Sequence, residues 1–164
     1  MKKIAVTALL FALIFSLAAC GSRTAEPPAD VTDPANVTAQ IPNPVVDVDS
    51  AEAFNELGIT LEAPENAQDV YYSIISGTIA QIQFTADGAR YNLRASKTED
   101  DISGVYGSLK ETKELKGGAL MDELADGETV YHVVHWAADG VNYVLSNTDG
   151  ASSDAALAVY ESLQ

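Results

Sequence analysis

The feature that most constrains the fold is a hairpin signal that occurs twice. Asp87-Gly88 and Asp139-Gly140 each stand between two runs in which apolar and polar residues alternate. Asp-Gly favours a two-residue hairpin turn, and a period of two is typical of strands that bury one face. A shift of 52 residues also aligns the large apolar side chains of the two segments: Phe84 with Trp136, Tyr91 with Tyr143, Leu93 with Leu145. The sequence therefore predicts one hairpin design used twice in an antiparallel sheet.

The same alternation, rich in Val, Ile, Tyr and Thr, extends over most of the chain from residue 69 onward. It predicts strands at 69–76, 79–86, 89–96, 129–138 and 141–147, and a further one near 119–124. A short helix is expected between an N-cap at Asp49 and a stop at Gly58. A last helix over about 153–163 has an apolar stripe made of Ala156, Val159, Tyr160 and Leu163. The predicted fold is α+β: an antiparallel sheet of about five or six strands, covered on one face by the C-terminal helix, with a short N-terminal helix.

The register of each hairpin follows from its two-residue turn. In the first hairpin the side opposite Phe84 and Leu93 is wholly polar, which predicts a solvated outer face; it holds Gln81, Gln83, Thr85, Arg90, Asn92 and Arg94. In the second hairpin the corresponding side is half apolar and is expected to be partly covered; it holds Tyr131, Val133, His135 and Val144.

The N-terminus has the layout of a targeting segment. Lys2 and Lys3 precede a nearly unbroken apolar run from 4 to 19, slightly shorter than a stable membrane span. The run ends in Leu17-Ala18-Ala19-Cys20, which resembles the lipobox of bacterial lipoproteins. This resemblance implies cleavage after Ala19 and acylation of Cys20, with palmitate among the expected acyl groups. A plain secretory signal, cut at Ala19 without acylation, is the alternative.

Three parts of the chain are expected: a lipoprotein signal peptide at 1–19, an anchored Cys20 with a Pro-rich tether at 20–43, and a single globular domain at 44–164. Five of the six prolines lie in or beside the tether, and its other residues are mostly small or polar. Such a composition buries too little apolar area to offset the entropy of ordering. An ordered arm lying on the domain is the alternative.

Several short blocks resemble a known group of proteins. The opening blocks are Asn43-Pro44, Asp49-Ser50, Leu57-Gly58-Ile59 and Ala63-Pro64-Glu65; the later ones are Arg94-Ala95-Ser96, Asp101-Ile102-Ser103-Gly104-Val105-Tyr106, His135-Trp136 and Asn142-Tyr143. Together they resemble small cell-surface lipoproteins of Gram-positive anaerobes that carry a domain of unknown function. The Ile-Ser-Gly-x-Tyr block is the most specific part. Val105 stands where the family tends to have Asp, which argues against a dedicated cation site in this loop.

Charge narrows the class of partner. With 9 Lys plus Arg against 24 Asp plus Glu, the net charge of −15 argues against a nucleic-acid partner, whose phosphates need basic residues. Every Lys and Arg after residue 23 lies between Arg90 and Lys116. These charges either offset the acidity or form a recognition face for carboxylate or phosphate on a partner protein or wall polymer. The candidate binding face consists of Gln81, Gln83, Arg90, Asn92 and Arg94.

The sequence offers little catalytic or metal chemistry. His132 and His135 have the spacing of a helical metal pair, but in a strand they point to opposite faces. The acidic loop 99–101 is either a solvated capping loop or a weak calcium site. A single cysteine excludes a disulfide framework and four-thiolate sites, and no nucleophile-elbow, phosphate-loop or zinc-helix motif occurs.

These features predict no catalytic residue, no cofactor and no metal. The expected function is that of a non-catalytic, lipid-anchored extracytoplasmic binding or interaction module. It is expected to be a monomer, held to the membrane through Cys20, with an unknown protein or wall polymer as partner. The alternatives are a small hydrolase acting on cell-wall or extracellular polymer and an envelope-sensing regulatory protein.

Overall fold

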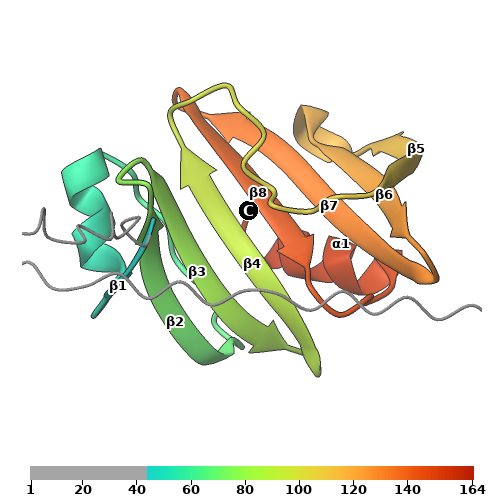
Figure 1. The fold of residues 1–164 in the computed structure, drawn as a ribbon, viewed down its shortest axis with the longest axis horizontal. Helices are drawn as coiled ribbons and strands as arrows, with labels where there is room; N and C mark the ends of the chain where they lie inside the picture. The colour runs from blue at the N-terminus through green and yellow to red at the C-terminus, as the bar shows by residue number, and fades with distance from the viewer. Residues whose placement is uncertain (1–43) are drawn as a thin grey trace, which may run out of the picture. The chain divides into compact units, whose positions relative to one another are not determined.

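The computed structural model describes residues 44–164 (Figure 1). The predicted signal peptide, the cleavage after Ala19, the Cys20 anchor and the tether lie outside the described residues. No helix within 44–164 has the length and apolarity that a bilayer-spanning helix needs.

The described chain forms one antiparallel sheet of eight strands in the order β1-β2-β3-β4-β8-β7-β6-β5 (Figure 1). The strands are β1 (Val45–Val48), β2 (Gln68–Ile75), β3 (Ile79–Ala86), β4 (Ala89–Ser96), β5 (Ser108–Glu114), β6 (Leu120–Asp126), β7 (Thr129–Ala138) and β8 (Val141–Asn147). With a C-terminal helix packed on the sheet, the protein is mostly β with minor helix. The six predicted strands are confirmed, and the predicted total of five or six is wrong.

The two strands that the sequence did not predict, β1 and β5, form the two edges of the sheet. β1 has only four residues and directly follows Pro44, so it offers too short a pattern to recognise. β5 reads Ser-Leu-Lys-Glu-Thr-Lys-Glu, and all seven residues are exposed. Because neither face of β5 is buried, no apolar alternation marks it, and its charges protect an exposed edge from pairing with another chain.

The two Asp-Gly hairpins are confirmed in turn and in register. Asp87, Gly88, Asp139 and Gly140 all have positive φ, as a type I′ turn requires. Phe84 faces Tyr91 across β3 and β4, as Trp136 faces Tyr143 across β7 and β8.

The hairpins meet at the centre of the sheet, where β4 pairs with β8. Leu93 there faces Leu145, its own equivalent 52 residues later. The same register pairs Tyr91 with Asn147 and Ala95 with Tyr143, so the pairing is unchanged when the two strands are exchanged. The β3–β4 and β7–β8 hairpins are therefore related by a local pseudo-twofold axis through the Leu93–Leu145 pair.

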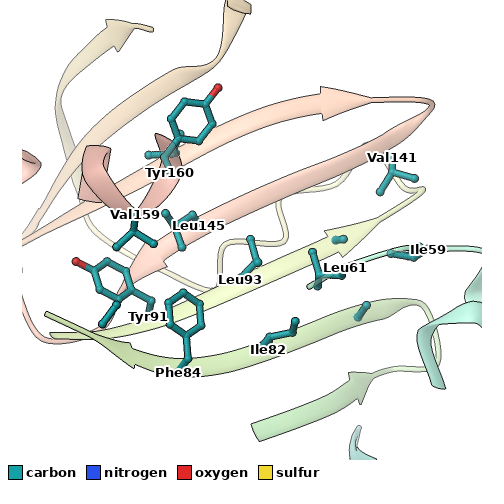
Figure 2. Packing of buried hydrophobic residues seen from close by; sticks show 14 of the residues in the cluster. Ile59, Leu61, Ile82, Phe84, Tyr91, Leu93, Val141, Leu145, Val159 and Tyr160 are labelled. Atoms are coloured by element: carbon teal, nitrogen blue, oxygen red, sulfur yellow. The ribbon is translucent and has the colours of Figure 1, made fainter. Parts of the chain in front are cut away.

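One face of the sheet, called here the helix face, carries the main core (Figure 2). Its strand residues include Ile82, Phe84, Tyr91, Leu93, Val134 and Leu145, and it is covered by η1 (Ala51–Leu57) and by α1 (Ser153–Ser162). Phe54 of η1 contacts Tyr72, and Tyr160 of α1 meets Trp136 edge-on with ring centroids 5.2 Å apart. Three of the four predicted stripe residues are buried in α1, namely Ala156, Val159 and Tyr160, and the fourth, Leu163, is the partly buried C-cap of the helix.

The first helix differs in detail from the prediction. It is a 3₁₀ helix whose N-cap is Ser50 rather than Asp49, and the Ser50 side chain makes no capping hydrogen bond. Gly58 ends it with a φ of 63°, the left-handed conformation expected of a glycine stop.

The opposite face of the sheet is covered on one half only. Residues 97–107, the connection from β4 to β5, cross β8, β7 and β6 on this face, with α1 on the other side of the sheet (Figure 1). We call these residues the strap, and this side of the sheet the strap face. Ile102 of the strap is buried against Val133 and Val144, which confirms that the outer face of the second hairpin is partly covered.

Candidate functional site

Arg94 fastens the strap to the sheet. Its Nε donates a hydrogen bond to Gln81 Oε1 (2.7 Å), and its Nη1 donates one to the carbonyl of Ile102 (2.9 Å). Gly104 lies directly against the guanidinium, since a Cβ there would be 3.1 Å from Arg94 Cζ and closer still to Nη1. Burial lowers the pKa of Arg94, while Asp101 and Tyr106 raise it. The guanidinium stays charged, so these are charge-assisted hydrogen bonds.

Short-range hydrogen bonds give the strap its shape. Asp101 Oδ1 accepts from the backbone N–H of Ser103 (2.8 Å), and Ser103 Oγ accepts from the N–H of Val105 (3.2 Å). Asn142 of β8 donates from Nδ2 to the carbonyl of Thr98 (2.6 Å). The strap is thus tied to β4 at Arg94 and to β8 at Asn142, and Asp101 has the capping role expected of a turn carboxylate.

The predicted binding face contains side chains that bind one another. Gln81 is only 4% exposed and donates to Ser73 Oγ (3.0 Å) while it accepts from Arg94. Gln83 donates to Asn92 Oδ1 (3.0 Å). The expectation of a solvated outer face is therefore wrong at Gln81, because this face uses amide and guanidinium groups to bury polar atoms. The binding role assigned to these residues stays a prediction.

The six basic residues between 90 and 116 do not gather into one patch. Arg94 points inward under the strap, whereas the Arg90 side chain is 72% exposed and its Nε lies 3.8 Å from Asp149. Lys97 lies beside Gly58, near the first helix. The remaining three lie on the edge strand or just after it: Lys110, Lys113 and Lys116. Their closeness in sequence reflects the path of the strap and of β5.

The strap and the second half of the sheet enclose an open groove of about 660 Å³. Its floor comes from β6, β7 and β8, one wall from the strap, and its outer end from the edge strand β5. Three of its lining side chains are large, apolar and solvent-exposed: Tyr106 at 86%, Leu109 at 59% and Leu120 at 44%. This groove is the candidate functional site, because exposed apolar side chains beside a concave surface mark binding regions.

Four carboxylates and one imidazole also line the groove. They belong to Glu99, Asp100, Asp101, Asp122 and His135, and among the described lining residues there is no Lys or Arg. His135 Nε2 lies 3.4 Å from Asp122 Oδ2, and Thr112 donates to Asp122 Oδ1 (2.6 Å). Thr112 therefore contacts the carboxylate and not the imidazole, so these three side chains do not form the hydroxyl–imidazole–carboxylate order of a catalytic triad.

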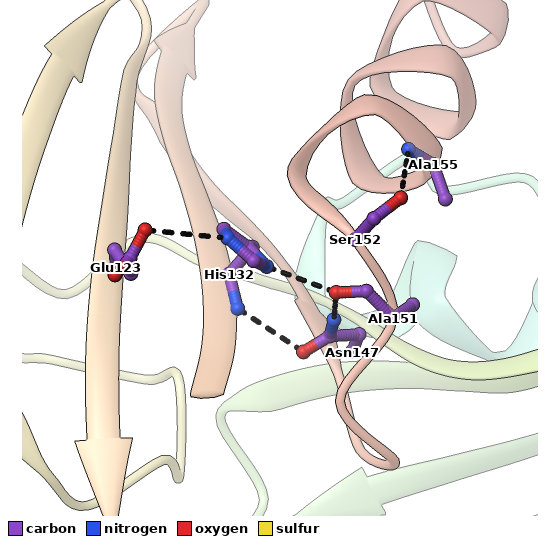
Figure 3. Close-up of polar contacts among 6 residues, drawn as sticks. All are labelled: Glu123, His132, Asn147, Ala151, Ser152 and Ala155. Carbon is purple, nitrogen blue, oxygen red and sulfur yellow. Dashed lines mark hydrogen bonds and ion pairs between the residues drawn. The ribbon is translucent and has the colours of Figure 1, made fainter. Parts of the chain in front are cut away.

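The two histidines point to opposite faces of β7, as their spacing in a strand requires. His132 lies on the helix face, where its Nδ1 donates to the carbonyl of Ala151 (2.9 Å) and its Nε2 is 3.7 Å from Glu123 (Figure 3). Asn147 Nδ2 donates to the same carbonyl (2.7 Å), and its Oδ1 accepts from the N–H of His132. These groups fix the turn from β8 into α1, so His132 has a structural role.

The acidic loop 99–101 and the two histidines are the candidate metal ligands of the sequence. Within 44–164, no three His, Cys, Asp or Glu side chains come together closely enough to share a metal ion.

Comparison of the chain with protein-family models, with curated proteins and with solved structures gave no match. The resemblance to lipoproteins of Gram-positive anaerobes therefore stays a prediction.

Sequence reasoning missed the apolar part of the groove, namely Tyr106, Leu109 and Leu120. Two signals pointed toward it: the half-apolar outer face of the second hairpin and the Ile102-Ser103-Gly104 block. The first predicts that something covers this face, but not which segment. The structure shows that the Ile102-Ser103-Gly104 block covers this face, because Arg94 holds the strap there.

Proposed function

We propose that this chain is a non-catalytic, lipid-anchored extracytoplasmic protein that works as a binding or protein-interaction module. The lipobox-like Leu17-Ala18-Ala19-Cys20 after a short apolar run supports the anchor. Acylated Cys20 would hold the domain at the outer surface of the cell membrane, at the end of the Pro-rich segment.

The observation that carries the binding proposal is the groove beside the strap. Tyr106, Leu109 and Leu120 expose large apolar surfaces around a volume within the range of roughly 300–1,000 Å³ common for ligand sites. A folded domain gains stability by burying such side chains, so leaving three of them exposed around one groove favours a role in recognition.

The hydrolase alternative gains no support from a catalytic triad in this groove, because Thr112 donates to Asp122 and not to His135. An envelope-sensing regulator would use the same surface, since a sensor also needs a partner to contact.

The anchor is tested by replacing Cys20 with Ala in the full chain. We expect labelling with a clickable palmitate analogue to be lost and the protein to leave the membrane fraction. Palmitate labelling that persists in this variant would contradict the anchor, because the chain has no other cysteine.

The groove is tested with a photo-crosslinking amino acid placed at Tyr106 in cells that produce the full chain. Tyr71 is the matched control, because it is a tyrosine 67% exposed on β2, away from the strap. We expect a discrete crosslinked product at position 106 and none at position 71. Equal products at both positions, or none at either, would contradict a binding function of the groove.

A further inference from the structure

The apolar side chains of the groove lie next to carboxylates. Leu109 of β5 and Leu120 of β6 line it at opposite ends of the β5–β6 pair, and Tyr106 of the strap has 86% of its surface exposed. Asp100 and Glu99 line the same groove on the strap, in the segment that leaves β4. A ligand lying along the groove would therefore meet apolar and anionic groups together.

The charges of the groove are unevenly compensated. Asp101 lies near Arg94 and accepts from the Ser103 N–H, and Asp122 is occupied by Thr112 and His135. Glu99 and Asp100 form no ion pair within the described residues, and no Lys or Arg of the described chain lines the groove. A concave surface lined by carboxylates concentrates cations and repels anions.

From these two properties we infer that the groove takes a short polypeptide segment of a partner in which Lys or Arg stands next to apolar residues. This inference rests on the proposed binding function and adds the chemistry of the ligand. A Lys or Arg side chain suits this surface because its methylene stem packs on apolar groups while its cation reaches carboxylates. The exposed Tyr106 ring adds a surface on which such a cation is attracted to the aromatic face.

A peptide fits the site better than an isolated cation because apolar side chains and carboxylates line the same groove. Leu109 and Leu120 lie on adjacent strands, and Glu99 and Asp100 lie on the strap. An extended segment with alternating basic and apolar residues presents the two kinds of side chain on its two sides. The groove offers both kinds of complementary group.

The test uses the full chain in a zwitterionic detergent and a blocked synthetic peptide of alternating Lys and Leu. A peptide with Glu in place of every Lys is the charge-reversed probe. We expect the Lys peptide to bind in isothermal titration calorimetry with a Kd below about 1 mM and the Glu peptide to show no binding. Equal affinity for the two peptides, or no binding of the Lys peptide, would overturn the inference.

Non-specific attraction to an acidic protein is controlled with matched charge removal. The double variant Glu99→Gln, Asp100→Asn should weaken Lys-peptide binding about tenfold, by loss of the local carboxylates. The double variant Glu52→Gln, Glu56→Gln removes the same charge from exposed positions on η1 and should change affinity less than about twofold. Equal effects of the two double variants would show diffuse attraction and overturn the inference.

The aromatic contact gives an independent readout. Tyr106→Ala should weaken Lys-peptide binding about fivefold, whereas Tyr71→Ala should leave it unchanged. If the Glu peptide binds as well as the Lys peptide and is equally weakened by Tyr106→Ala, the groove still binds ligands but the assignment of a basic segment is wrong. Failure of the crosslink at position 106 would instead remove the proposed function itself.

Discussion

The hairpins β3–β4 and β7–β8 have the same turn, register and helix face, but their strap faces differ. Gln81, Gln83, Asn92 and Arg94 of the first hairpin are replaced in the second by their equivalents Val133, His135, Val144 and Ser146. The first set consists of polar side chains that are hydrogen-bonded in pairs, and the second is half apolar, with Val133 and Val144 buried under the strap. The two hairpins therefore share the residue pattern of the helix face. Their strap faces differ, and the groove lies on the strap face of the second hairpin.

The segments that follow the two central strands, β4 and β8, also lie on opposite faces of the sheet. After β4 the chain passes onto the strap face, where Arg94 binds the carbonyl of Ile102. After β8 it passes onto the helix face, where Asn147 and His132 bind the carbonyl of Ala151. In each half a polar side chain from the sheet binds a carbonyl a few residues beyond the strand end. The groove is formed by the segment that follows β4, because this segment passes onto the strap face.

The largest expected effect tests the symmetry of the core. Leu93 and Leu145 are fully buried and face each other at the pseudo-twofold axis. Replacing either with Ala should lower the free energy of unfolding by about 3 kcal/mol, through lost burial and a cavity. The measurement is urea denaturation followed by circular dichroism. A cost near zero for one leucine and about 3 kcal/mol for the other would show that the two halves are not equivalent in the core.

The next effect comes from giving the second hairpin the polar residue of the first. Val133→Gln puts an amide under Ile102 in the position equivalent to Gln81, where Ser146, whose buried Oγ has no hydrogen-bond partner among the described residues, stands opposite in place of Arg94. We expect a loss of about 2–3 kcal/mol in the free energy of unfolding, since one hydroxyl satisfies only part of a buried amide. Val133→Ala is the control for lost packing alone. If the two variants unfold at the same urea concentration, the polar network is not what separates the halves.

Both hairpins can be predicted from the sequence, but the strap that covers one of them cannot. The Asp-Gly turns and the alternating residues predict six strands, both hairpins and the pairing of Phe84 with Tyr91, because turn length and period are local properties. The strap is not local: Arg94 binds Ile102 across a connection with no periodic pattern, and β5 beyond it has no buried face. The groove depends on both, so its exposed apolar residues could not be placed from the sequence.

Loss of the strap clamp should have a somewhat smaller effect on stability. Arg94→Ala leaves Gln81 Oε1 and the carbonyl of Ile102 without their donor, at a cost of about 2 kcal/mol. Amide hydrogen exchange should increase in the strap more than in β2 or β3. Arg90→Ala is the matched control, with a change within about 0.5 kcal/mol because its side chain is mostly exposed. Unchanged exchange in the strap would mean that Arg94 does not hold it.

Loss of the corresponding hydrogen bonds after β8 should lower the free energy of unfolding slightly less. Asn147→Ala removes one of two donors to the carbonyl of Ala151 and the acceptor for the N–H of His132. Because His132 still donates to that carbonyl, we expect a loss of about 1–2 kcal/mol. Exchange should increase at the start of α1 and not in the strap. Increased exchange in the strap alone would contradict separate clamps for the two exits.

The smallest effect distinguishes the two equivalent tyrosines and appears only at alkaline pH. Burial raises the pKa of Tyr91, and Asp149 and Asp87 raise it further; burial and Asp139 raise the pKa of Tyr143. Above about pH 10 the unfolded chain ionises these phenols while the folded chain retains their protons, so the free energy of unfolding falls as pH rises.

At neutral pH, Tyr91→Phe should change stability by less than about 0.5 kcal/mol, because its buried hydroxyl has no hydrogen-bond partner among the described residues. At alkaline pH it should flatten the fall in stability, and more than Tyr143→Phe does, because Tyr91 is the more deeply buried of the pair. Urea titrations between pH 8 and pH 11 measure both slopes, and a steeper fall after Tyr91→Phe would contradict the raised pKa of this phenol.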